Sequence, residues 1–366
     1  MHPLSERLPE FPWDRLLRAK DRAASHPDGL VDLSIGTPVD PTPDAVQVAL
    51  RSAADSPGYP AVWGTPEVRA SIVNYLRRRC GSVELGDDSI LLTIGSKELV
   101  ASLPTQLGLG RSDTVLIPAL AYPTYAVGAA FAGARCTASD STLSVGPARV
   151  SLVWLNSPAN PNGRVLPPDH VRKVISWARD RGAVVASDEC YFEYAWDADP
   201  VSVLDPEVNG GSLDSVLAVH SLSKRSNLAG YRAGFVAGDP MLVSALREIR
   251  RHAGLMVPTP VQQAMQVALD DDHHVAEQRE RYRARRATLR VALESAGFRI
   301  DHSQGALYLW ATRDEPCLDT VRWLAERGIL AAPGDFYGPS GAQHVRFALT
   351  ATDERIAAAA SRLVAA

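Results

Sequence analysis

The sequence predicts an α/β protein with one large and one smaller domain. Short apolar runs, each long enough for a buried strand, alternate with longer amphipathic segments along most of the 366 residues. Pro66, Pro168 and Pro240 stand at the start of three amphipathic segments, where the first turn of a helix tolerates proline. A chain of this length can fill more than one substantial core.

The order of the elements follows from these runs. The strands expected in the large domain are 90–94, 114–117, 151–155, 183–187, 216–219 and 233–237. The helices expected among them include 66–79, 98–107, 168–181 and 240–252. This alternation is typical of a mostly parallel sheet between helices.

The pattern changes near residue 270. A long charged helix is expected at 277–295, ended by Gly297. After it the sequence predicts a strand at 307–311, a helix at 318–326, a strand at 345–348 and a last helix from 353. We therefore expect three parts: an N-terminal segment (1–40) that packs with the small domain, a large domain (41–274) and a small α/β domain (275–366).

Composition argues against several classes of partner. The chain is 46% apolar and 22% charged, with a formal net charge of −4, so nothing favours nucleic acid or a membrane surface. The N-terminal residues lack the apolar core of a signal peptide, and we expect a cytoplasmic protein. The four cysteines are scattered, which predicts free thiols and no metal site.

Polar side chains follow five of the predicted strands. Ligands of a mostly parallel α/β sheet bind beyond the carboxyl ends of its strands. The residues at these ends, in chain order, are Gly95, Ser96 and Lys97, then Tyr122, Asn160, Asp188 and Tyr191, and finally Ser221 and Lys224. Each group alone is weak, but their ordered occurrence indicates one ligand site.

Lys224 is the first candidate for chemistry. A lysine just after a buried strand would be desolvated, so its amine could be partly neutral and nucleophilic toward an aldehyde. A surface lysine in a serine-rich loop is the plainer interpretation of this segment alone. Eight residues on, Arg232 stands in a glycine-flanked stretch, where its guanidinium could approach a phosphate closely.

Asp188 ends a buried strand, and a buried carboxylate needs a partner. The partner could be a structural cation or a protonated pyridine nitrogen, whose ring would then act as an electron sink. Tyr191, three residues later, could reach the phenolic oxygen of the same ring.

The remaining candidates each have a plainer interpretation. The stretch 95–97 could bind phosphate at a helix N-terminus or form a tight turn. Tyr122 could stack on a cofactor ring or pack in the core. Asn160 could bond a ring hydroxyl or serve turn chemistry. Arg346, on an apolar strand, could bind a substrate carboxylate or form a structural salt bridge.

Together these residues resemble the fold-type I aminotransferases of class I/II over nearly the whole chain. The resemblance implies a seven-stranded, mostly parallel sheet, a homodimer with active sites at the subunit interface, and pyridoxal 5′-phosphate (PLP) as cofactor. Lys224 would bind the aldehyde and carry the proton, and Asp188 would pair with the pyridine nitrogen. Tyr191 and Asn160 would bond the phenolic oxygen, and Tyr122 would stack on the ring.

The resemblance also assigns the phosphate and the substrate. The phosphate ligands would be the side chains of Ser96, Ser221 and Arg232 and the backbone at Gly95 and Lys97. Tyr59 would reach the phosphate of the neighbouring subunit. Arg346 would bind the substrate α-carboxylate, with Gly36 nearby. Asn162 departs from the threonine usual in the family, a change expected to affect the turn more than the chemistry.

At a finer level the chain is similar to actinobacterial succinyldiaminopimelate transaminases of lysine biosynthesis. The similar stretches are 11–14, 24–29, 34–41, 121–125, 220–224, 307–311 and 332–338. This similarity implies N-succinyl-LL-2,6-diaminopimelate as amino-acid substrate and glutamate with 2-oxoglutarate as the other pair. Lys97, Arg225 and Arg251 are the candidates for its distal carboxylates.

Two other functions stay open. A β-lyase that cleaves C–S bonds, or a transaminase for aspartate or aromatic amino acids, would keep the cofactor and the site. A non-catalytic PLP-binding regulator would need a DNA-binding domain, and no basic helix-turn-helix pattern is evident in the sequence.

Overall fold

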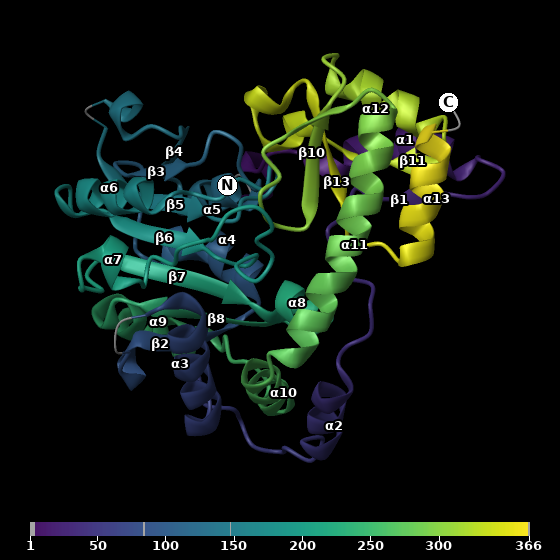
Figure 1. The fold of residues 1–366 in the computed structure, drawn as a ribbon. Coiled ribbons are helices and arrows are strands. Elements are labelled where there is room, and N and C mark those ends of the chain that lie inside the picture. The colour runs from purple at the N-terminus through teal and green to yellow at the C-terminus, as the bar shows by residue number, and fades with distance from the viewer. Residues whose placement is uncertain (1–3, 83–84, 147, 365–366) are drawn as a thin grey trace.

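The structure is a computed structural model that describes residues 4–82, 85–146 and 148–364. A large sheet lies between two layers of helices, and a second, smaller sheet with its own helices faces one end of it (Figure 1). The predicted α/β class is confirmed. In the described part of the chain, no helix is long and apolar enough to cross a membrane.

The large sheet has seven strands in the order β2-β8-β7-β6-β5-β3-β4. Their bounds are β2 (Ile90–Ile94), β3 (Thr114–Ile117), β4 (Arg135–Ala138), β5 (Val150–Asn156), β6 (Val184–Asp188), β7 (Val216–Ser221) and β8 (Ala233–Gly238). β8 runs antiparallel to both of its neighbours, and the remaining neighbouring pairs are parallel. Six strands match the predicted runs. The seventh, β4, is a mostly exposed edge strand and carries no apolar run.

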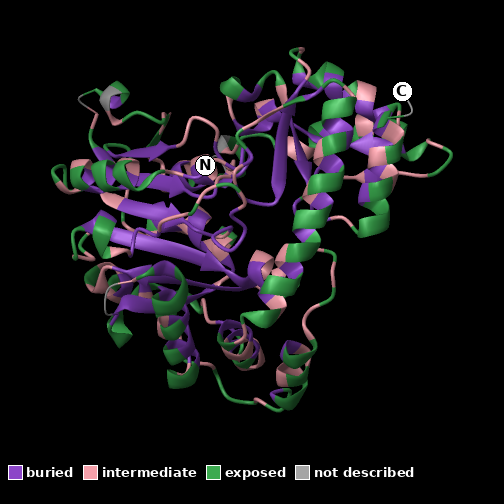
Figure 2. Ribbon diagram, in the orientation of Figure 1, coloured by how far each residue is buried: buried purple, intermediate pink, exposed green. Residues whose placement is uncertain are grey.

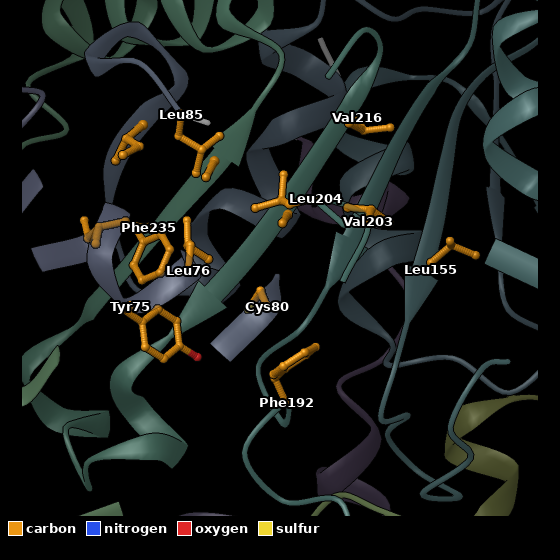
Figure 3. Packing of buried hydrophobic residues seen from close by; sticks show 14 of the residues in the cluster. Tyr75, Leu76, Cys80, Leu85, Leu155, Phe192, Val203, Leu204, Val216 and Phe235 are labelled. Carbon is orange, nitrogen blue, oxygen red and sulfur yellow. The ribbon is translucent and has the colours of Figure 1, made fainter. Parts of the chain in front are cut away.

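Helices cover both faces of this sheet. Their bounds are α3 (Pro66–Cys80), α4 (Ser96–Gln106), α5 (Thr124–Ala132), α6 (Pro168–Arg179), α7 (Pro206–Asn209), α8 (Leu222–Arg225), α9 (Pro240–Ala253) and α10 (Thr259–Asp270). One core cluster joins α3, α6 and α10 to the sheet, and another joins α4, α5 and α9 to its other face. Figure 3 shows part of the first cluster, where Tyr75, Cys80 and Phe192 lie close together.

The second part of the molecule is built on a four-stranded antiparallel sheet in the order β12-β13-β10-β9. The strands are β9 (Arg299–Asp301), β10 (Tyr308–Thr312), β12 (Ala332–Pro333) and β13 (His344–Ala348). Its helices are α11 (His273–Ser295), α12 (Cys317–Ala325) and α13 (Asp353–Val364). The long helix α11 begins beside α10 and runs up into this part (Figure 1).

The N-terminal residues pack against this second part. After a short 3₁₀ helix (Pro12–Leu16) and α1 (Leu17–Ala24), β1 (Val31–Asp32) pairs in parallel with β11 (Ile329–Leu330). Leu16, Val31 and Leu33 belong to the same buried cluster as the small sheet. α2 (Asp44–Ser52) instead lies beside α10. The domain boundaries at 40 and 274 stay a prediction.

The large sheet is buried throughout its middle strands, and exposed residues gather on the outer helix faces (Figure 2). The arrows of β6 and β7 point toward the second sheet (Figure 1). The carboxyl ends of the parallel strands therefore open onto the region between the two sheets, where the candidate residues lie.

Candidate active site

Lys224 lies in α8, the single helical turn that follows β7. Its ammonium group donates a hydrogen bond to the backbone carbonyl of Gly36, which belongs to the N-terminal segment. Burial lowers the pKa of Lys224 from its ordinary value, and neighbouring groups add smaller effects in both directions. An amine held this way is closer to the neutral, nucleophilic form than a surface lysine is.

Asp188 is the last residue of β6 and is only 7% exposed. Burial raises the pKa of its carboxyl, because the charged form loses its hydration. Among the described residues no lysine or arginine forms an ion pair with it. A buried carboxylate without a cationic side chain can accept a cationic ligand, and a protonated pyridine nitrogen is one.

Tyr125 is a site residue that the sequence reasoning missed. Its fully buried hydroxyl donates a hydrogen bond of 2.9 Å to Oδ2 of Asp188. The other carboxylate oxygen accepts from the backbone N–H of Cys190 at 3.2 Å. Tyr125 is the second aromatic residue of the stretch 121–125, which the sequence had singled out for Tyr122. By sequence pattern alone, however, an aromatic residue on an apolar helix cannot be distinguished from a core residue.

Gly95, Ser96 and Arg232 come together where β8 lies between β2 and β7. Gly234 pairs with Thr93 on one side and with Ser221 on the other. A Cβ built on Gly95, whose φ is +72°, would collide with the Arg232 guanidinium, so only glycine fits there. Ser96 then begins α4, and its backbone amide faces this cluster near Gly234.

The cluster has the composition of a phosphate site. A helix N-terminus, a guanidinium and serine hydroxyls all favour an anion. Arg232 donates to the carbonyl of Ala229 at 2.9 Å and has no carboxylate partner among the described residues. The hydroxyl of Ser221 lies 2.9 Å from that of Ser223. Lys97 lies in the first turn of α4, so its backbone N–H is the group that would face a phosphate, while its side chain is exposed.

Arg346, on β13, is 2% exposed and bonds only neutral acceptors. It donates to Oδ1 of Asn160 and to the carbonyl of Ser34, both at 2.7 Å. Its Nε is buried and has no hydrogen-bond partner in the described chain. A guanidinium without a carboxylate is poorly compensated, and its fork geometry suits a carboxylate ligand.

Asn160 joins the two sheets at this point. It lies in the loop after β5, and its backbone N–H donates to Asn156 Oδ1 at 2.7 Å. Because its side-chain oxygen accepts from Arg346, its amide nitrogen remains as a donor. Asn162, two residues on, accepts from the N–H of Arg164 at 3.1 Å, so its side chain serves the turn.

Three further candidates occupy different surroundings. Tyr122 is half-buried, and its ring meets Tyr125 edge-on at 5.9 Å between centroids. Tyr191 is buried, and its hydroxyl lies 2.6 Å from that of Tyr308. Tyr59 lies in the loop between α2 and α3 and is 98% exposed.

A second polar cluster lies behind this site. Cys80, Glu189 and His220 come together from α3 and the ends of β6 and β7, with potential ligand atoms within 4.8 Å of one another. Their sequence separation hid this proximity. Glu189 Oε2 and His220 Nε2 lie 3.1 Å apart, and Glu189 Oε1 accepts from the N–H of Val203 at 3.0 Å. Glu189 Oε2 and His220 Nε2 are both buried, and neither atom has a hydrogen-bond partner in the described chain.

One correction concerns Arg225, a candidate for binding distal substrate groups. It is 3% exposed and its charge is already paired, with Glu193 at 3.2 Å and Asp272 at 2.7 Å. A guanidinium held by two carboxylates has a structural role. His274, in the first turn of α11, also forms side-chain hydrogen bonds in this region. Its ring bonds Asp271 at 2.8 Å and Ser226 at 2.9 Å.

The geometry thus fits a phosphorylated pyridine aldehyde. A cluster suited to phosphate, a carboxylate suited to a ring nitrogen and an amine of lowered pKa lie along the ends of adjacent strands. Arg346 approaches from the second sheet. This combination defines the class of PLP-dependent enzymes that act on amino acids.

Comparison with known proteins agrees. Residues 28–363 match the aminotransferase class I and II family. A probable aminotransferase of Mycobacterium tuberculosis is 60% identical, covering 98% of this chain and 86% of the relative. The transaminase OxyQ of Streptomyces rimosus, named for 4-dedimethylamino-4-oxo-anhydrotetracycline, is 59% identical, covering 97% and 99%.

Solved structures show the same fold. An aminotransferase from Neisseria meningitidis superposes with a TM-score of 0.91 and 30% identity, covering 100% of this chain and 99% of the other. A probable N-succinyldiaminopimelate aminotransferase from Thermus thermophilus gives 0.86 and 27%, covering 97% and 100%.

The chain belongs to the class I and II aminotransferase family. It is a PLP-dependent aminotransferase of fold type I, and its substrates are an amino acid and a 2-oxo acid. The predicted family, cofactor and fold are confirmed.

Proposed function

We propose that this aminotransferase acts through Lys224, with Arg346 as the residue that binds the substrate α-carboxylate. The observation that carries the proposal is the buried guanidinium of Arg346, which bonds neutral acceptors and keeps an unpartnered Nε. A substrate carboxylate would supply the missing charge. Substituting Arg346 with lysine should raise KM for both substrates, since the bidentate geometry is lost.

The protein residues then have defined tasks. PLP, when bound, supplies an aldehyde and a cationic ring that accepts electron density. The Lys224 amine would take the proton from the substrate Cα as a base and deliver it, as an acid, to the carbon atom of the former cofactor aldehyde. Asp188 keeps the ring nitrogen charged, and the hydroxyl of Tyr191 and the amide of Asn160 bond the ring oxygen. Ser96, Ser221 and Arg232 hold the phosphate.

For the specific reaction we propose the transamination that interconverts N-succinyl-LL-2,6-diaminopimelate and its oxo acid. In the biosynthetic direction of lysine formation, glutamate donates the amino group and N-succinyl-LL-2,6-diaminopimelate is the product. The Thermus neighbour's description supports this choice. Of the three basic candidates for the distal carboxylates, Arg225 is already paired. Arg251, 69% exposed, lies near Glu248 at 3.8 Å. Lys97 remains, because it is exposed and directly follows Ser96 of the phosphate cluster.

A second candidate substrate is a fused aromatic ketone. The Streptomyces relative supports it, since 59% identity covers nearly both chains. The rim of the site also suits a ring system. Phe11 is 55% exposed, with its ring 5.5 Å from Trp13 and the Lys97 ammonium 5.9 Å above it. Such a surface could contact a planar ligand.

A panel of half-reactions would separate these substrates. The PLP form is mixed with N-succinyl-LL-diaminopimelate, glutamate, aspartate, an aromatic amino acid or cystathionine, and loss of the aldehyde absorption is followed. The pyridoxamine phosphate form is tested with the aromatic ketone. We expect succinyldiaminopimelate and glutamate to react fastest. Equal rates with common amino acids would remove the narrow assignment, and pyruvate with ammonia from cystathionine would indicate a lyase.

Lys97→Met tests the distal contact. It should raise KM for succinyldiaminopimelate about tenfold, the effect of losing one charged hydrogen bond, and leave KM for alanine unchanged. Arg251→Met is the matched control and should change neither value. An equal rise for both amino acids would contradict a distal role for Lys97.

We also propose a homodimer. Tyr59 is almost fully exposed, as expected for a residue that reaches a neighbouring subunit's phosphate. Tyr59→Phe should weaken PLP binding, and sedimentation should give twice the mass of one chain. A monomer with full PLP affinity would contradict the proposal.

A further inference from the structure

Tyr308 contacts three of the residues that the sequence assigned to the site, although it was not itself assigned. It is the first residue of β10 and is 2% exposed. Its hydroxyl lies 2.6 Å from the hydroxyl of Tyr191. The Arg346 guanidinium stacks over its ring with Cζ 4.0 Å from the centroid.

The third contact is with Gly36. A Cβ built on Gly36 would collide with the Tyr308 hydroxyl and would lie only 2.7 Å from Cε1 of the Tyr308 ring. The carbonyl of the same glycine accepts the hydrogen bond from Lys224. The phenol therefore lies beside the backbone that holds the lysine, and the site leaves no room for a side chain at position 36.

Which of the two hydroxyls, Tyr191 or Tyr308, donates the hydrogen bond follows from counting their protons. Each phenol has one proton to donate, and both hydroxyls lie in a buried environment. If Tyr191 donates its proton to the ring oxygen of PLP, it cannot also donate to Tyr308. Tyr308 must then donate to Tyr191. A hydroxyl that accepts a hydrogen bond becomes a stronger donor itself.

We propose that Tyr308 is a positioning residue for the reaction, acting through Tyr191: its hydroxyl orients the Tyr191 hydroxyl toward the cofactor and strengthens that hydrogen bond. This inference rests on the proposed role of Tyr191. The ring of Tyr308 separately supports the Arg346 guanidinium by a cation–π contact. One side chain thus links the cofactor side of the site to the substrate side.

The test uses the absorption of the bound cofactor, which changes with pH as the linkage between PLP and Lys224 loses its proton. A hydrogen bond to the ring oxygen favours the form with more negative charge on that oxygen, which is the deprotonated form. Weakening that hydrogen bond should raise the pH at the midpoint of the absorption change. We expect Tyr308→Phe to raise it by about 0.5 pH unit, in keeping with loss of part of one neutral hydrogen bond.

Tyr337→Phe is the matched control. Tyr337 is also buried, and Arg346 also stacks over its ring, at 5.0 Å, but its hydroxyl has no hydrogen-bond partner in the described chain. This variant should leave the midpoint unchanged. The Tyr308→Phe variant keeps the ring under Arg346, so KM for amino acids should stay within about twofold of wild type.

A double-mutant cycle decides whether Tyr308 acts through Tyr191. In a Tyr191→Phe background, Tyr308→Phe should add no further shift, because the hydroxyl it serves is gone. A full additional shift in that background, or no shift in wild type, would overturn the inference. If Tyr191→Phe alone leaves the midpoint unchanged, the proposed role of Tyr191 fails instead.

Discussion

Removing the hydroxyl of Tyr125 should weaken cofactor binding without touching any atom that reaches the cofactor. In Tyr125→Phe, Asp188 loses a 2.9 Å hydrogen bond inside a buried environment. Burial already raises the pKa of this carboxyl, so loss of a donor favours the neutral form further. A hydrogen bond to a charged group contributes about 2 kcal/mol, which corresponds to about a 30-fold loss of affinity.

The assay is titration of the cofactor-free protein with PLP, followed by absorbance or by quenching of tryptophan fluorescence. Tyr282→Phe is a suitable control, because Tyr282 is a fully buried tyrosine in the core of the small sheet and makes no bond to Asp188. Its affinity for PLP should equal that of wild type. If Tyr125→Phe bound PLP as tightly as wild type while Asp188→Asn did not, support of the carboxylate by Tyr125 would be refuted.

Three further predictions concern stability and reactivity. Asp188→Asn should stabilise the cofactor-free protein relative to wild type, because the folded wild type holds the Asp188 proton to higher pH than the unfolded chain does. The difference in the free energy of unfolding should grow from the ordinary carboxyl pKa of 3.8 up to the raised pKa of the folded protein, and then stay constant. Urea unfolding at several pH values tests this, and a difference between variant and wild type that does not change with pH would contradict it. Arg225→Met should lower the free energy of unfolding by about 2 kcal/mol, because the buried carboxylate of Glu193 loses one of its two cationic partners and keeps only Arg79, at 2.7 Å; an unchanged urea midpoint would refute it. Burial raises the pKa of the Cys190 thiol well above its ordinary value, so iodoacetamide should modify this thiol slowly. Bound PLP should slow the modification further. Equal rates of modification with and without PLP, measured by peptide mass spectrometry, would contradict this.

Much of the fold could be predicted because buried parallel strands are continuous apolar runs. The strand ends were equally visible, since a polar residue such as Asp188 or Lys224 directly follows each run. β4 could not be found in this way, because an exposed edge strand carries no apolar run. Its place depends on pairing with β3, which is a long-range contact.

The parts of the site that escaped prediction are those made by tertiary contact. Asn160 and Arg346 are 186 positions apart, and nothing in either segment specifies that one bonds the other. Tyr125 and Tyr308 have the pattern of core residues, and only the placement of their hydroxyls distinguishes them. The paired state of Arg225 likewise depends on Glu193 and Asp272, which come from two other segments.

The reversed direction of β8 has a mechanical consequence. Because this strand starts at the edge where β7 finishes, Lys224 and Arg232 sit on one short connection, eight positions apart. The lysine proposed to bind the aldehyde and the arginine proposed to bind the phosphate therefore share one segment of the chain. Arg346 lies on β13 of the smaller sheet. If it binds the substrate carboxylate as proposed, a movement of that sheet relative to the large one would change substrate binding without displacing the residues proposed to hold the cofactor.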